Sequence, residues 1–370
     1  LAAFLIVGIT GIPYTEVMIA AALPALVYYL YLMVAVHIRA VKYELDPSRL
    51  LNAPEMQSVE AITFGAALLR FGHLLIAIGV LVYLLVIEMP PGNAAMYSLL
   101  VLLVLDALKR FVLARRTPLA AAREALRVLV QGLESGARSG AQVAVVIAVI
   151  GVLVEMLGVT GFAQKLSNAM LELAGGNLAA LLIIAALACI AFGLGLPTSA
   201  AYILVAVLGA PSLHEMGVPL LAAHFFVFYY ANLSSITPPV AVAAMVAANI
   251  AQGSYFRTAM LSVRLGLPGF LLPFMFVVHP EILGIDTTAI EAVLVAAGAL
   301  AGVIAFNVAF EGFLLTHLAW WERLLLIPAS VGLIFPGYEE SIFGTILFAI
   351  VGAVQMVKLK REKARAEAVA

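Results

Sequence analysis

Long apolar stretches alternate with short polar segments along most of the chain. A helix that crosses a bilayer needs about 20 mostly apolar residues, and several stretches approach that length. These candidate spans are residues 16–36, 72–88, 95–113, 140–158, 257–279, 287–306, 323–335 and 341–357. The segment 323–335 is the weakest of them because it is short. The pattern predicts an all-α, polytopic helical membrane protein.

Two further apolar regions are interrupted in the middle. Residues 178–209 contain the sequence GLGLPTS at 193–199, and residues 219–247 contain SSITPP at 234–239. Lipid offers no hydrogen-bond partners to an unwound backbone, so such interruptions normally line a protein cavity where the backbone binds something. Each interruption alone offers few oxygens. We therefore expect the two to lie side by side and to face one polar cavity.

Both interruptions combine residues that break a helix with hydroxyl side chains. Neutral oxygens and freed carbonyls suit a hard cation such as Na⁺, and free N–H groups at helix starts suit a carboxylate. The candidate ion- and substrate-binding residues are Gly193, Gly195, Pro197, Thr198, Ser199, Asn232, Ser234, Ser235, Thr237, Pro238 and Pro239. Among them, Thr198, Ser235 and Thr237 are the expected Na⁺ ligands. The competing interpretation is a pair of proline kinks between packed helices.

The basic residues predict the topology, because Lys and Arg concentrate in cytoplasmic loops. The groups assigned to the cytoplasm are Arg39, Lys42 and Arg49; Lys109, Arg110, Arg115, Arg116, Arg123, Arg127 and Arg138; Arg257 and Arg264; and Lys358, Lys360, Arg361, Lys363 and Arg365. Loops 88–93, 279–286 and 336–340 lack Lys and Arg. Cytoplasmic and outer loops alternate consistently along the chain only if residues 178–209 form a re-entrant hairpin and residues 219–247 form a broken spanning helix. It places the C-terminus in the cytoplasm and Ser212 in an outer loop.

Composition narrows the possible functions. Mean hydropathy is +1.12, and 64% of the residues are hydrophobic while 11% are charged. A soluble protein of this size cannot bury so much apolar surface, and nothing resembles a nucleic-acid-binding surface. The single cysteine, Cys189, excludes an intramolecular disulfide. Acidic residues are scarce at span centres, which favours Na⁺ over proton coupling.

Enzyme motifs are weak. His214-Glu215 starts like a zinc-protease motif, but no second histidine follows at helical spacing. There is no phosphate-binding loop, so we expect no ATP hydrolysis, no enzymatic activity and no cofactor. An intramembrane enzyme and a purely structural membrane subunit are the alternatives that the residues leave open.

The chain divides into four expected parts. Residues 1–117 form the end of a first repeat with scaffold helices, and 118–138 form an amphipathic helix on the cytoplasmic surface. Residues 139–283 form a second repeat, and 284–370 form C-terminal membrane helices with a charged tail. Residues 2–37 and 243–279 are weakly similar in sequence, and the distribution of basic residues gives the two segments opposite orientations in the membrane. This similarity indicates an inverted repeat. Because the chain starts with Leu1 inside an apolar run, we expect it to begin partway through a larger protein.

Several of these motifs resemble one transporter family. The segments are 193–202 (GLGLPTSAAY), 222–229 (AAHFFVFY), 234–241 (SSITPPVA), 264–270 (RLGLPGF), 273–276 (PFMF) and 10–16 (TGIPYTE). Together they are similar to the large membrane subunit of tripartite ATP-independent periplasmic (TRAP) transporters, closest to the fused permease type. The resemblance covers roughly residues 1–283, mostly the family's second repeat.

The resemblance implies a Na⁺-driven, elevator-type importer in the bacterial inner membrane. A periplasmic substrate-binding protein would deliver an organic acid to it across the lipid bilayer. The family's first-repeat hairpin would precede Leu1, so the missing N-terminal half or a small membrane subunit is an expected partner. The identity of the carboxylate, the Na⁺ stoichiometry and the oligomeric state stay open.

Overall fold

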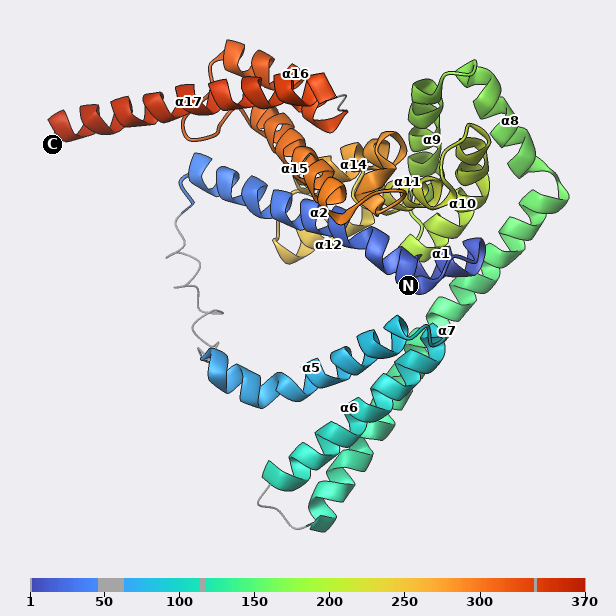
Figure 1. Cartoon of the computed structure of the whole chain (residues 1–370). Helices are drawn as coiled ribbons and strands as arrows, with labels where there is room; N and C mark the ends of the chain where they lie inside the picture. Colours follow the sequence, from blue (N-terminus) through green and yellow to red (C-terminus); the bar gives the residue numbers. More distant parts are fainter. Residues whose placement is uncertain (1, 46–62, 114–117, 336–337, 370) are drawn as a thin grey trace. The chain divides into compact units, whose positions relative to one another are not determined.

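The computed structural model describes residues 2–45, 63–113, 118–335 and 338–369, and these ranges consist almost entirely of helices (Figure 1). Contacts divide the chain into two compact units. The first unit comprises residues 1–12, 16–45 and 153–370, and the second comprises residues 13–15 and 46–152. Each unit is described by itself below. The all-α polytopic fold expected from the sequence is confirmed.

The second unit is built around a helical hairpin. Helix α5 (Phe64–Val86) packs against α6 (Pro91–Leu113), and the Ser98 hydroxyl donates a hydrogen bond to Ala77 O at 2.7 Å across the pair. The chain continues into α7 (Pro118–Val159), whose last turns belong to the first unit. Arg49, Arg115 and Arg116 lie outside the described residues.

Helix α7 differs from the expected division at residues 138–139. A separate amphipathic helix over 118–138 and a span over 140–158 were expected, and the structure has one continuous helix across both. No proline follows Pro118 within the helix, so no residue there removes a backbone hydrogen bond. The chain bends by 67° only after Val159, where Gly161 adopts φ 63° and α8 (Phe162–Ala174) begins.

The first unit contains the remaining helices. They are α1 (Ala2–Thr10), α2 (Tyr14–Lys42), α8, α9 (Leu178–Gly193), α10 (Thr198–Glu215), α11 (Leu220–Leu233), α12 (Val242–Ile250), α13 (Tyr255–Leu265), α14 (Leu267–Val278), the short 3₁₀ helix η1 (Pro280–Leu283), α15 (Ala289–Glu311), α16 (Trp320–Ile334) and α17 (Tyr338–Val369). Helices α9, α10, α11 and α14 pack around a shared core that includes Tyr202, Phe225, Phe226 and Phe276, all fully buried.

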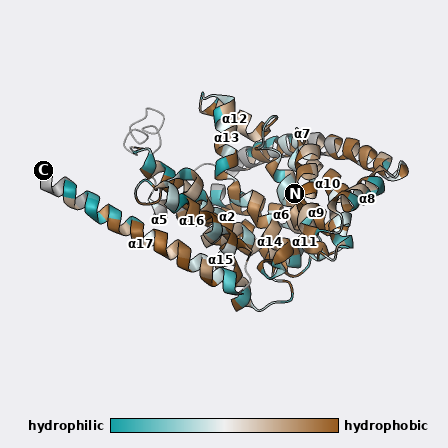
Figure 2. Ribbon diagram, turned by 90° about the horizontal axis from the view of Figure 1, so that it is seen from above, coloured by the Kyte–Doolittle hydropathy of each residue, from teal (hydrophilic) through white to brown (hydrophobic). Residues whose placement is uncertain are grey.

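Among the residues that the structure describes, five helical segments are long and apolar enough to cross a membrane. They are Tyr14–Lys42, Pro91–Lys109, Tyr255–Val278, Ala289–Glu311 and Glu339–Glu362, and each overlaps a span expected from the sequence. The expected span 72–88 corresponds to the shorter apolar segment Phe71–Val86 of α5, and the expected span 323–335 corresponds to α16. Hydrophilic residues concentrate toward the free end of α17, as Figure 2 shows, in line with the charged tail expected there.

The two segments of the expected repeat follow the same order of elements. Helix α1 has 9 residues and is followed by Gly11 at φ 72° and the long helix α2, which contains Pro24. Helix α12 also has 9 residues and is followed by Gln252 at φ 49° and the segment α13–α14. Each of the two segments therefore consists of a short helix, a turn with a left-handed residue and a long helical segment with proline.

Candidate functional site

The first break separates two neighbouring helices, α9 and α10. Helix α9 starts at a capped end, where Asn177 Oδ1 accepts a hydrogen bond from Ala180 N at 3.1 Å. It ends at Gly193, and Gly195 then adopts φ 76°, a conformation that favours glycine. Pro197 precedes α10 with an extended backbone. The interruption expected at 193–199 is present, and the two helices pack against each other.

The second break follows α11. Residues 234–241 leave the helix, the Pro238–Pro239 peptide bond is cis, and Ala241 adopts φ 34° before α12 begins. The Ala243 N–H donates to Ser235 O at 3.0 Å, and Tyr255 OH donates to Pro239 O at 2.7 Å. These bonds hold the unwound segment in a defined shape.

The structure brings the two breaks together. The hydroxyl of Ser234, in the second break, lies 2.9 Å from Gly193 O, in the first break. It can donate a hydrogen bond to this carbonyl. A Cβ atom added to Gly193 would lie 2.7 Å from that hydroxyl oxygen, and one added to Gly195 would lie 3.6 Å from Val240 Cγ1. Glycine is therefore required at 193 for this close approach. The expectation that the breaks lie side by side agrees with these contacts, and the polar cavity between them stays a prediction.

The hydroxyl groups of the second break face backbone carbonyls of α11. Ser235 Oγ donates to Asn232 O at 2.7 Å, and Thr237 Oγ1 donates to Leu233 O at 2.7 Å. A hydroxyl has one hydrogen and two lone pairs, so both oxygens keep the capacity to bind a cation. Asn232 Nδ2 likewise donates to Phe228 O at 2.9 Å, which leaves its side-chain oxygen available as a ligand.

The helices that start at the breaks lack side-chain caps. Neither Pro197, which precedes α10, nor Ala241, which precedes α12, makes a side-chain hydrogen bond to the first turn. The first N–H groups of a helix have no partner within the helix, and together with the helix dipole they attract anions. Thr198 is exposed at the start of α10, so its side of this helix end is accessible.

The remaining predicted site residues differ in exposure. Ser199 and Ser234 are buried, whereas Asn232, Ser235, Thr237 and Pro238 are partly buried. Gly195, Pro197, Thr198 and Pro239 are exposed. The predicted site residues therefore extend from the interior of the protein to its surface. Ser212, expected in an outer loop, lies within α10 and is fully buried, because α10 extends to Glu215.

Several residues support the breaks without having been predicted. Tyr202 OH lies 2.8 Å from His224 Nδ1, and this buried pair joins α10 to α11. Tyr230 OH donates to Phe270 O at 2.7 Å, which joins α11 to α14. A Cβ on Gly266 would lie 2.7 Å from Ile236 Cδ1, so α14 begins directly against the second break. The signal in the sequence that could have indicated these supporting residues is a tyrosine or histidine within an otherwise apolar helix.

Comparison with known proteins identifies one family. The family model described as the tripartite ATP-independent periplasmic transporter, DctM component, matches residues 1–289. This range includes both breaks and ends near the start of α15. No curated protein and no solved structure matches the chain.

Proposed function

Because the chain belongs to the DctM family of tripartite ATP-independent periplasmic transporters, we propose that it is the permease part of an importer that moves an organic acid with Na⁺. Membership makes it a multi-pass membrane protein of a transporter. It also implies a periplasmic binding protein and a small membrane component as partners. The coupling ion, the carboxylate and the mechanism are our proposals.

The contact between the two breaks carries the proposal. It gathers side-chain oxygens and backbone carbonyls from two interrupted helices within one region, linked by Ser234 and Gly193 at 2.9 Å. Hard cations bind several oxygens at once, and interrupted helices supply such sets in secondary transporters. We assign Na⁺ to the oxygens of Ser235 and Thr237, with Thr198 contributing from the first break.

A carboxylate would bind at the uncapped start of α10. The first N–H groups there lack side-chain partners, and their partial positive charge suits an anionic substrate. Na⁺ at the adjacent oxygens would then be close to the substrate's negative charge. Each ligand would strengthen the binding of the other, which is the energetic basis of coupled transport.

For the movement itself we propose an elevator. Helices α9, α10, α11 and α14 pack on one another, and we assign them to the block that would carry both breaks. The core that they share continues into α2 and α15. The positive residues of the described helix ends, such as Arg39 and Lys358, support our proposal that the C-terminus of the chain lies in the cytoplasm. We assign the protein to the inner membrane of a bacterial cell.

Substitution of Thr237 by Val tests the Na⁺ assignment. Valine keeps the shape and removes the oxygen, so we expect a clear loss of the stabilisation that Na⁺ gives over K⁺ at equal ionic strength. Ligand binding to the folded state raises the melting temperature, so thermal denaturation of the purified chain is the measurement. In the complete transporter, reconstituted with its binding protein, Na⁺-dependent uptake should fall in parallel.

Thr345→Val is the matched control. The Thr345 hydroxyl donates to Ser341 O at 2.7 Å, the same bond to the carbonyl four residues earlier that Thr237 makes. It lies in α17, away from both breaks in sequence. Equal Na⁺ effects in the two variants would remove Thr237 from the site. Uptake that runs equally well on a proton gradient without Na⁺ would overturn the coupling ion.

A further inference from the structure

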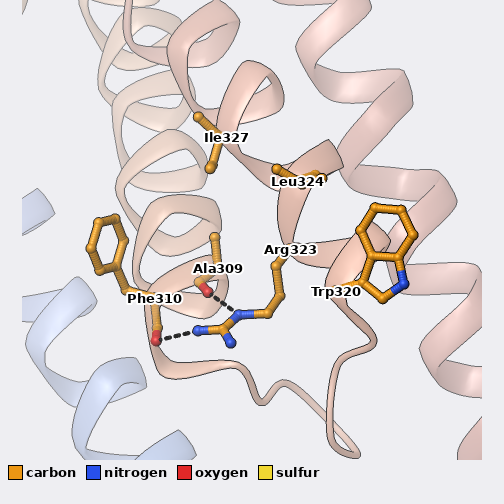
Figure 3. Close-up of a pocket in the computed structure, with 6 residues that line it drawn as sticks. All are labelled: Ala309, Phe310, Trp320, Arg323, Leu324 and Ile327. Atoms are coloured by element: carbon orange, nitrogen blue, oxygen red, sulfur yellow. Dashed lines mark hydrogen bonds between the residues drawn. The ribbon is translucent and has the colours of Figure 1, made fainter.

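A surface cavity opens where α15 ends and α16 begins. Its volume is about 390 Å³. The lining residues, drawn in Figure 3, are Ala309, Phe310, Trp320, Arg323, Leu324 and Ile327. The cavity lies in the C-terminal helices, beyond the residues that match the transporter family. The proposed transport function uses none of these side chains.

The guanidinium of Arg323 is held in a fixed position at this cavity. Its Nε donates to Ala309 O at 2.8 Å and its Nη2 donates to Phe310 O at 2.9 Å (Figure 3). Gly312, at φ 68°, makes room for it, because a Cβ there would lie 3.2 Å from Arg323 Cζ. A guanidinium has five N–H donors, so three remain for a ligand.

The carboxylates at the end of α15 and the start of α16 are already paired with basic side chains. Glu311 forms ion pairs with Arg39 and with Lys42, each at 3.0 Å. Glu322 is fully buried and lies 2.6 Å from Lys358 Nζ. Within the described part of the chain, no carboxylate pairs with Arg323. The cavity therefore presents a positive charge whose natural partner is an anion from outside the protein.

The other walls of the cavity are apolar and face outward. The exposed fractions are 61% for Phe310, 56% for Leu324 and 42% for Ile327. The chain's two tryptophans, Trp320 and Trp321, are both at this turn. Tryptophan concentrates where the bilayer meets water. The cavity thus combines a headgroup-level cation with an apolar wall that α16 and the end of α15 form, and α15 is long enough to cross the membrane.

We propose that this cavity binds an anionic phospholipid. The phosphate accepts hydrogen bonds from the free N–H groups of Arg323, a geometry that guanidinium favours. One acyl chain lies along Phe310, Leu324 and Ile327. A zwitterionic lipid fits less well, because its ammonium group adds a second positive charge beside the guanidinium.

Fluorescence quenching tests the proposal, because tryptophan occurs at this turn and nowhere else in the chain. In the Trp321→Phe variant, Trp320 reports on the cavity alone. The protein is placed in phosphatidylcholine vesicles that contain either dibromo-phosphatidylglycerol or dibromo-phosphatidylcholine at equal mole fraction. We expect the brominated anionic lipid to occupy the cavity about fivefold more strongly, the effect of one basic residue near a membrane surface.

The variants separate charge at the cavity from charge elsewhere. Arg323→Gln should bring the ratio of the two lipids close to one, and Arg323→Lys should keep a clear preference. Arg361→Gln removes one positive charge from α17 and should leave the ratio unchanged. Equal quenching by both lipids in the parent protein would overturn the proposal, as would an unchanged ratio in Arg323→Gln. Loss of the preference in inorganic phosphate, against chloride at equal ionic strength, would assign the site to free phosphate instead.

Discussion

A glycine lies against a neighbouring segment both at the break site, which the two interruptions at 193–199 and 234–241 form, and between the C-terminal helices α16 and α17. Different atoms make the contact in the two places. At the break site, a Cβ added to Gly193 would meet the Ser234 hydroxyl at 2.7 Å. Between α16 and α17, a Cβ added to Gly332 would meet Glu340 O at 2.6 Å, and one added to Gly344 would meet Ala329 O at 2.8 Å. One contact is with a side chain and the others are with backbone.

This difference separates a contact whose polar atom can adjust from contacts that backbone carbonyls make. A serine hydroxyl can rotate to another acceptor, and Ser234 Oγ already has a second acceptor in Ala231 O at 2.6 Å. A carbonyl inside a helix moves only with its helix. The C-terminal helices therefore suit a fixed scaffold, whereas the break site keeps polar atoms that a bound ion can reorganise. The predictions below ask whether stability and ion binding separate in the same way.

Gly332→Ala should have the largest effect. The added methyl group would collide with Glu340 O, so α16 and α17 must move apart, which costs about 3 kcal/mol of unfolding free energy. Thermal denaturation measures the loss, and the difference between Na⁺ and K⁺ should persist. Gly352→Ala, in α17 with open space around it, is the control and should be neutral or stabilising. A normal melting temperature for Gly332→Ala would contradict the rigid contact.

Gly193→Ala should act mainly on ion binding. Its methyl group would push on the Ser234 hydroxyl and on Ser234 Cβ at 2.9 Å, which separates the two breaks. Overpacking of about 2 kcal/mol corresponds to roughly a 30-fold loss of Na⁺ affinity if it falls on the site. Titration of the melting temperature with Na⁺ measures it. Gly158→Ala, a helical glycine with nothing within 4 Å, should leave the affinity unchanged.

Much of the fold could be predicted from the sequence, because apolar length and period are local signals. The positions of both breaks follow from Gly193, Pro197 and the Pro238–Pro239 pair, whose backbone effects need no tertiary information. The contact between the breaks was inferred from what a cation requires. The continuity of α7 across residues 138–139 was missed, since charged residues there suggested a surface element and nothing in them ends a helix.

The supporting contacts could not be predicted, because they join residues far apart in sequence. The approach of Gly266 to Ile236 and the bond from Tyr255 to Pro239 O depend on how α13 and α14 fold back onto the second break. The burial of Ser212 depends on helices packed around α10. A single sequence carries the local preference of each residue but not the identity of its packing partner.

Ser234→Ala should have an intermediate effect. It removes the hydroxyl that joins the two breaks, a hydrogen bond worth about 1 kcal/mol. Ser212→Ala is a close control, because Ser212 is also buried and its hydroxyl donates to Gly209 O at 2.9 Å within α10. The melting temperature in Na⁺ and in K⁺ isolates the contact between the breaks. If Ser212→Ala lowers the Na⁺ effect as much as Ser234→Ala, the bond to Gly193 has no special role.

Tyr255→Phe should have the smallest effect and sets a lower limit for the comparison. The lost bond, from Tyr255 OH to Pro239 O at 2.7 Å, is solvent-exposed, so water replaces it and the cost is about 0.5 kcal/mol. The bond nevertheless holds the second break, so the loss should appear in the Na⁺ titration and not in K⁺. Tyr29→Phe is the control, because Tyr29 is 70% exposed on α2, outside the breaks. A loss of equal size in both salts would show that Tyr255 stabilises the fold alone. The break would then hold its shape through the hydroxyls of Ser235 and Thr237, which donate back to α11.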